Sequence, residues 1–380
     1  MSVQIPDPQL HPEVAKNQHL VPQCYMREWS YNGKDSVWIY DKAALFDPEH
    51  PEQSKWSITS KKTDKINSID YFHDTNAGSF YMPEDALSEL FGFLQPFSIS
   101  LNGTPLDSLE KLNMYYSEFA NWKICNPDGS EVTLSDRQKI QSYLDKSRYT
   151  YIETQWSRKY ENTWRQDITA LEQKVRALKI QATTGIPATQ GITSDDLNAI
   201  IEYLIIFDWR SQNGAWVIDD TLDMFVGIIP EEIMNAPVST SSSADQFHKE
   251  DVTFKDQLRH QMLLRYFDSF LRNDSGTLRE VIDITSDRLS VCFCLTDPTY
   301  PFITSDKPAY LYTRPDGWKE YVFVARPTML ISMGRGNKGE YHICDLSHDE
   351  VDTYNKATAD QGTMLIVPSN TFPISSLLTT

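Results

Sequence analysis

The sequence predicts an α+β protein in which a large helical middle region separates short N-terminal strands from a C-terminal antiparallel or mixed sheet. Three observations support this prediction. The stretch VWIYDK (37–42) alternates like a strand near the start of the chain. Residues 134–180 contain neither Pro nor Gly and repeat aromatic side chains at helical spacing. After residue 280, short apolar or alternating runs are separated by turn residues.

A length of 380 residues suits two domains, or one domain with a large insertion. We expect an extended arm at 1–16, where prolines are frequent. Residues 17–80 and 281–380 should together form a core domain from both chain ends, and residues 81–280 a helical region. The strands predicted at 37–42 and 65–72 should join the sheet of residues 281–370.

The N-terminal part predicts several short elements. HLVPQCYMREW should be a short helix or turn entered through Pro22, and residues 47–56 a proline-bearing loop. A helix should start near Pro83. A second should begin with Thr104 as its N-cap and Pro105 at its first position. NPDGSE (126–131) predicts a turn.

The middle region predicts long helices. In the stretch 134–180, Trp156, Tyr160 and Trp164 are spaced to share one face, which should point to the core. Loops are expected at 182–191 and at 239–246. Between them, Thr193 and Asp196 have the spacing of a cap and its partner at the start of a buried helix.

The C-terminal part predicts strands with one helix among them. The Gly-rich stretch MGRGNKGE (333–340) lacks the strand-loop-helix context of a phosphate-binding loop, so we expect a hairpin loop there. Ser347 should cap a helix whose third position is Glu350. TMLIVPS (363–369) should be the final strand.

Composition limits the classes of function. The formal net charge is -18, from 53 acidic and 35 basic residues. This balance favours solubility and disfavours broad nucleic-acid binding, although a local basic cleft stays open. The N-terminus lacks the basic and apolar regions of a signal peptide, and no apolar run approaches membrane-spanning length. We therefore expect a bacterial-type cytoplasmic protein that does not insert into membranes.

The five cysteines are scattered along the sequence. Cys292 and Cys294 form a C-x-C pair on a predicted strand, with their side chains on one face. A metal site would need further ligands at suitable spacing, and none stands nearby in the sequence. We expect buried reduced thiols.

Four side chains are candidate catalytic residues. His19 precedes Pro22 and can serve as a general acid or base, or bond the backbone near the chain start. Arg210 ends an apolar helix and needs a partner such as Asp208 or Asp306, or an anionic ligand. Ser305 and Asp306 in ITSDKP lie at a strand end, where they can build a site or only form a local turn.

The ordered set NQHLVPQCYMREWS, VWIYDK, IIFDWRSQ, PFITSDKPAYLY, YVFVARPTMLISM and VDTYNKATADQGTMLIVPSN resembles the bacterial domain-of-unknown-function 4238 (DUF4238) family. The resemblance spans roughly residues 17–370. This chain departs from the family pattern at Leu20, Trp29 and Lys307, where an aromatic residue, Phe and Asn are common. The resemblance implies that His19 and Arg210 converge with the Thr-Ser-Asp-Lys-Pro element of residues 304–308. It also implies a link to phage or mobile-element defence.

Two functional hypotheses follow. In the first, the protein is a hydrolase or nuclease acting on a phosphodiester or nucleotide. His19 is its general acid/base, Arg210 stabilises phosphate charge, and Asp306 orients His19 or holds a divalent cation. Three further residues would contact the substrate: Arg27, Lys307 and Asn355. In the second, the same residues form a buried structural network in a non-catalytic protein that recognises a ligand or a partner protein.

Overall fold

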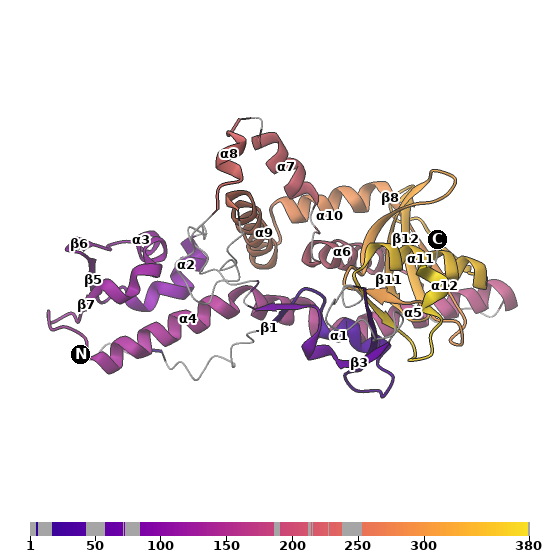
Figure 1. Ribbon diagram of the computed structural model, residues 1–380, viewed down its shortest axis with the longest axis horizontal. Helices are drawn as coiled ribbons and strands as arrows, with labels where there is room; N and C mark the ends of the chain where they lie inside the picture. The colour runs from indigo at the N-terminus through magenta and orange to yellow at the C-terminus, as the bar shows by residue number, and fades with distance from the viewer. Residues whose placement is uncertain are drawn as a thin grey trace, which may run out of the picture. The chain divides into compact units, whose positions relative to one another are not determined.

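The structure, a computed structural model, describes residues 5–6, 17–42, 58–70, 72, 84–185, 191–211, 214, 216–226, 228–237 and 253–378. The predicted loops at 47–56 and 239–246 lie outside these residues, as do Pro83, residues 186–190 of the loop predicted at 182–191, and all of the arm at 1–16 except residues 5 and 6. The predicted α+β class is confirmed (Figure 1).

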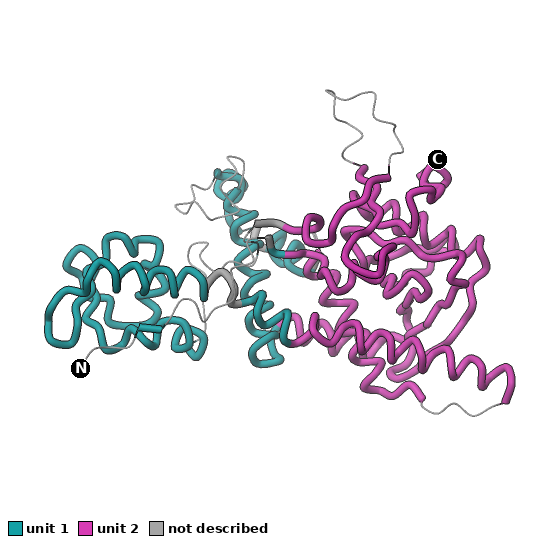
Figure 2. Tube along the Cα trace, turned by 90° about the horizontal axis from the view of Figure 1, so that it is seen from below, with its two compact units in different colours: residues 1–18, 69–158, 216–276 teal, residues 19–68, 159–215, 277–380 magenta. Residues whose placement is uncertain are grey.

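The chain forms two compact units, coloured separately in Figure 2. Unit 1 comprises residues 1–18, 69–158 and 216–276, and unit 2 comprises residues 19–68, 159–215 and 277–380. The predicted boundaries at residues 80 and 281 stay a prediction. All the candidate residues of the sequence analysis lie in unit 2.

The larger sheet of unit 2 has the strand order β10-β11-β12-β8-β13. Its strands are β8 (Leu289–Leu295), β10 (Ala309–Thr313), β11 (Lys319–Arg326), β12 (Met329–Arg335) and β13 (Tyr341–Asp345). Neighbours are antiparallel except β13, which runs parallel to β8. The hairpin predicted at 333–340 is therefore wrong. β8 lies between β12 and β13, so the loop after β12 crosses from one side of β8 to the other and does not join two paired strands.

A second sheet of unit 2 joins the two ends of the sequence. Its order is β3-β2-β14-β9, with β2 (Ser36–Asp41), β3 (Thr59–Lys62), β9 (Thr304–Ser305) and β14 (Met364–Val367). The prediction that N-terminal and C-terminal strands share a sheet is confirmed for β2. The strand predicted at 65–72 does not join this sheet. It is β4 (Ser68–Asp70), which pairs with β1 (Asn17–His19) in a two-stranded sheet.

Helices cover both faces of the larger sheet. The helices of unit 2 are α1 (Gln23–Met26), α5 (Trp164–Thr184), α6 (Ser194–Arg210), α10 (Thr277–Arg288), α11 (His348–Gln361) and α12 (Ile374–Leu378), with 3₁₀ turns η2 (Arg27–Trp29) and η4 (Thr63–Lys65). On one face, Phe207 of α6 stacks on Phe323 of β11, with ring centroids 5.3 Å apart. On the other face, Tyr354 of α11 donates to Glu320 of β11 at 2.9 Å. The predicted capping boxes at Thr193 and Ser347 are confirmed.

Unit 1 is mainly helical. Its helices are α2 (Glu84–Phe91), η5 (Gly92–Leu94), α3 (Leu109–Met114), η6 (Tyr116–Asn121), α4 (Leu134–Trp156), α7 (Trp216–Val226), α8 (Glu231–Met234) and α9 (Phe254–Asn273). Its small sheet has the order β6-β5-β7, formed by β5 (Ser98–Leu101), β6 (Thr104–Pro105) and β7 (Trp122–Cys125).

Two helix predictions need correction. Thr104 and Pro105 form β6, and the N-cap of α3 is Ser108. The preceding pair Asn102-Gly103 adopts φ values of 50° and 84°, so it makes the tight turn of a hairpin between β5 and β6.

The stretch 134–180, whose sequence shows no interruption, is not one continuous helix. It breaks after α4 into a π-helical turn, η7 (Ser157–Glu161), before α5 begins. Trp156, Tyr160 and Trp164 are nevertheless all buried, at 0%, 7% and 1% exposure, Trp156 in unit 1 and the other two in unit 2. Their burial is as expected, but they do not form one stripe on a single helix.

Candidate functional site

Arg210 is in direct contact with the backbone of His19. Its Nη2 donates to the His19 carbonyl oxygen at 2.7 Å, and its Nη1 donates to Oε1 of Glu161 at 2.9 Å. The Arg210 side chain is 1% exposed and is the last residue of α6. A guanidinium cannot shed its charge on burial, so it must be paired and hydrogen-bonded. The contacts tie the end of α6 to the start of the N-terminal motif.

The carboxylate partner of Arg210 differs from the two that were predicted. Glu161 takes this place, and neither Asp208 nor Asp306 does. Residues two apart on a helix point to different sides, so Asp208 cannot share the direction of Arg210. Asp306 is engaged elsewhere. Glu161 lies in the π-helical turn, and the sequence carried no signal that this turn would interrupt the helix.

Both ring nitrogens of His19 lie close to other protein groups. Nε2 lies 3.1 Å from the carbonyl oxygen of Thr63, and Nδ1 lies 3.5 Å from Nε2 of Gln23. Arg27, a predicted substrate contact, is exposed and donates to Oε1 of the same glutamine at 3.0 Å. This arrangement suits a structural histidine that donates from Nε2.

The Thr-Ser-Asp-Lys-Pro element forms a closed turn. Ser305 is fully buried, and its Oγ accepts from the Lys307 amide at 3.1 Å. The local turn was one of the two alternatives for these residues. The Asp306 carboxylate accepts from the Thr363 amide at 2.9 Å and from the Thr363 hydroxyl. Gly362 allows this approach, because a Cβ there would lie 2.3 Å from the Ser305 Cβ.

The N-terminal motif is bonded to this element. The Tyr25 hydroxyl donates to the Val324 carbonyl at 2.6 Å and lies 2.6 Å from the Thr304 hydroxyl, which therefore donates to it. The Trp29 indole donates to the Phe302 carbonyl at 2.9 Å. Tyr25 and Trp29 are buried. The beginning and the last third of the sequence thus meet in unit 2, through these aromatic residues as well as the shared sheet.

Burial shifts two acidic groups near this network. It raises the pKa of the Asp208 carboxyl to about 7, while the positive charge of Lys307 acts in the opposite direction. Burial also raises the pKa of the Cys24 thiol to about 12, with Glu161 adding to the effect and Arg210 opposing it. Cys24 therefore keeps its proton at neutral pH and is a poor nucleophile. Asp208 titrates in the physiological range.

Asn355, the third predicted substrate contact, is 1% exposed on α11. Its Oδ1 accepts from the Ile303 amide at 2.9 Å, so its amide holds the strand end in place. It also forms part of the wall of a cavity of about 390 Å³. The other residues around this cavity are Pro298, Thr299, Tyr300, Pro301, Asp352, Pro368, Ser369, Thr371, Phe372, Pro373, Ser376 and Leu377.

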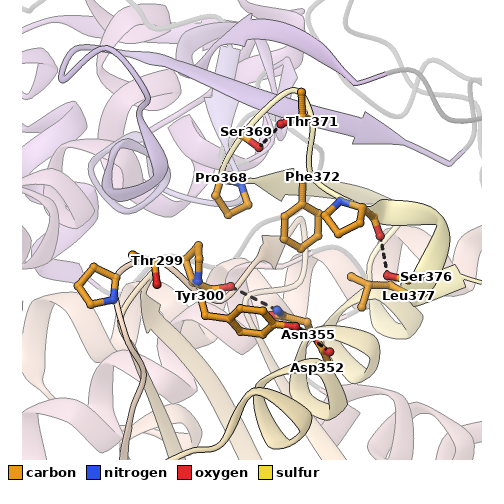
Figure 3. Close-up of a pocket in the computed structure, with 13 residues that line it drawn as sticks. Thr299, Tyr300, Asp352, Asn355, Pro368, Ser369, Thr371, Phe372, Ser376 and Leu377 are labelled. Atoms are coloured by element: carbon orange, nitrogen blue, oxygen red, sulfur yellow. Dashed lines mark hydrogen bonds between the residues drawn. The ribbon is translucent and has the colours of Figure 1, made fainter.

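The cavity is largely apolar with one charged group. Figure 3 shows Phe372 across the cavity from Tyr300 and Asn355. The Tyr300 hydroxyl donates to both carboxylate oxygens of Asp352 at 2.8 Å, and the Tyr300 ring stacks on His348 with centroids 4.0 Å apart. Neither Tyr300 nor Phe372 was predicted. A signal existed, since each aromatic directly precedes a proline that holds it in extended backbone.

Three cysteines form a cluster on the larger sheet. The sulfur of Cys344 lies 3.6 Å from that of Cys292 and 3.5 Å from that of Cys294. The sequence offered no further ligand at suitable spacing near the C-x-C pair, but the fold brings Cys344 beside it from 50 residues away. Among the residues that the structure describes, these three cysteines form a group of potential metal ligands whose sulfur atoms all lie within 4.8 Å of one another. The cation role of Asp306 stays a prediction.

The sequence profile described as "Protein of unknown function (DUF4238)" matches residues 17–371. No curated protein and no solved structure matches the chain significantly. None of the helices in the described part of the chain combines the length and hydropathy that crossing a bilayer requires. The chain belongs to the DUF4238 family.

Proposed function

We propose that this protein binds a small molecule in the cavity beside α11, and that His19, Arg210, Ser305 and Asp306 form a structural network that shapes unit 2. The observation that carries the proposal is the contrast between these two places. The network side chains bond to protein groups, whereas the cavity offers a half-open volume beside Asn355. A cavity of this size lies in the range of small-molecule sites.

The cavity walls favour a ligand with an apolar body and a cationic or hydrogen-donating group. Proline, Phe372 and Leu377 side chains supply the apolar surface, and Asp352 supplies a negative charge. None of the described residues that line the cavity is Lys or Arg, so a phosphate would meet no cation there. A small amine carrying an aromatic or aliphatic group fits these walls better than a nucleotide.

Thermal-shift measurements with matched panels test the proposal. Benzylamine and similar amines should raise the melting temperature of the wild-type protein, and mononucleotides at the same concentration should not. The Asp352→Asn variant keeps the size of the side chain but removes its charge, so the amine shift should shrink. Asp349→Asn is the matched control, because Asp349 is an exposed acidic residue on the same helix that does not line the cavity. Equal shifts in both variants would contradict the proposal.

A hydrolase is the second candidate, favoured by Asp208. A buried carboxyl with a pKa of about 7, close to the charge of Lys307, can act as general acid or base at neutral pH. A phosphodiester substrate, a divalent cation and a cytoplasmic role in phage or mobile-element defence belong to this candidate. It predicts cleavage of bis(p-nitrophenyl) phosphate with Mg²⁺ or Mn²⁺. The His19→Ala and Asp306→Ala variants should lose that activity while keeping the melting temperature.

A further inference from the structure

Three cysteine side chains converge where two parallel strands of the larger sheet lie side by side. Cys292 and Cys294 alternate along β8, so both point to the same face. On β13, Cys344 stands opposite Cys294 in the register, and its side chain reaches the same face. All three thiols are free.

The three sulfurs are spaced as a metal ion would hold them. Their separations are 3.5, 3.6 and 3.7 Å. Two sulfurs bound to a tetrahedral Zn²⁺ at about 2.3 Å lie roughly 3.8 Å apart, which is close to these values. A disulfide would bring two of the sulfurs to about 2.05 Å and push the third away.

The register also offers a fourth ligand. His342 stands opposite Cys292 and precedes Cys344 by two residues, so it lies on the same face of β13. Its side chain is 63% exposed, which leaves the imidazole room to change rotamer. Its Nε2 lies 3.4 Å from Glu340. Three thiolates and one imidazole make a ligand set that Zn²⁺ uses in structural sites.

We propose that Cys292, Cys294 and Cys344 bind one Zn²⁺ as thiolates, with His342 as the fourth ligand. Binding displaces three thiol protons to solvent and forms three Zn–S bonds and one Zn–N bond. The affinity should therefore rise with pH. The site shares no residue with the cavity or with the motif network.

The position of the site indicates a structural role. Among the described strands, β13 is the edge strand of its sheet and pairs with β8 alone. Edge strands are weakly held because one side has no hydrogen-bonded neighbour. A metal bound to β8 and β13 together would fasten this edge, so Zn²⁺ should raise the melting temperature by several degrees.

Cobalt titration of the full-length, reduced protein tests the proposal. CoCl₂ should bind at one ion per chain, with sulfur-to-cobalt charge-transfer bands and the strong visible bands of a tetrahedral site. ZnCl₂ should then abolish these bands by displacement. Single Cys→Ser substitutions at residues 292, 294 and 344 should each weaken binding on the order of 100-fold or more, since even outer-shell changes cost 10- to 100-fold.

Two further variants sharpen the result. Cys125→Ser is the matched control, because Cys125 is a free, half-buried cysteine on a strand outside the cluster. It should leave the titration unchanged. His342→Ala should weaken binding and shift the visible bands, and an unchanged spectrum would overturn the assignment of the fourth ligand.

The wild-type protein alone can overturn the whole proposal. Failure of the reduced chain to bind Co²⁺ or Zn²⁺ stoichiometrically would do so without any variant. The same conclusion would follow if thiol counting and mass spectrometry found a disulfide within the cluster that reforms in preference to metal binding.

Discussion

Replacing Arg210 by methionine should destabilise the protein by about 3–5 kcal/mol, which is the usual cost of removing one partner of a buried ion pair. The side chain is 1% exposed and donates to Glu161 at 2.9 Å and to the His19 carbonyl at 2.7 Å. Methionine fills similar volume, so the loss is mainly electrostatic. The substitution leaves the Glu161 carboxylate, whose side chain is 22% exposed, without its guanidinium partner. It also leaves the His19 carbonyl oxygen without this donor.

A double-mutant cycle with Glu161→Gln isolates the pair. Unfolding in guanidinium chloride, followed by circular dichroism, gives the free energy of unfolding for each variant. Arg210→Met and Glu161→Gln should each destabilise, and the double variant should lose at least about 1 kcal/mol less than the sum. Arg314→Met is the matched control, because Arg314 has a side chain 48% exposed and should change stability by no more than about 0.5 kcal/mol.

An Arg210→Met variant that loses less than about 1 kcal/mol, or an additive cycle, would refute the buried, coupled pair. A stable Arg210→Met variant that had lost an enzymatic activity would instead support the hydrolase candidate.

Three other variants test the network. Tyr25→Phe should cost about 1–3 kcal/mol, because it leaves the buried Thr304 hydroxyl without its acceptor, and urea unfolding measures the loss. Burial raises the pKa of Asp208 from 3.8 to about 7, so between these values the folded state holds a proton that the unfolded state has released. Stability should therefore fall as pH rises through that window, by up to about 4 kcal/mol, and unfolding of Asp208→Asn across the same pH range should lack the slope. Gly362→Ala should lower the melting temperature in a calorimetric scan, because its Cβ would overlap Ser305, at a cost of about 1–3 kcal/mol.

Local signals in the sequence predicted local structure well. The Thr193 and Ser347 capping boxes formed as expected, because a cap and its partner three residues later depend on one helical turn alone. The alternation of VWIYDK correctly predicted β2. The Thr104 error had a local cause too, since the Asn102-Gly103 turn signal outweighs an N-cap pattern two residues later.

The candidate site depended on long-range pairings that no local pattern encodes. Glu161 reaches Arg210 across 49 residues, and a π-helical turn sets its direction. Cys344 reaches Cys294 across 50 residues, because β13 passes β8 and pairs with it in parallel. The sequence correctly drew attention to Arg210 as a buried charge in need of a partner, but the identity of the partner came from the fold.

The central place of β14 has a consequence for how this protein is made. Ile366 of β14 pairs with Ile39 of β2, so β2 has β3 on one side but lacks its neighbour on the other side until the ribosome has added more than 300 residues. At a synthesis rate of about 5–20 residues per second, β2 waits on the order of tens of seconds. During that time this edge of β2 is open to wrong pairing. Premature termination before residue 364 would release a chain that cannot close this sheet.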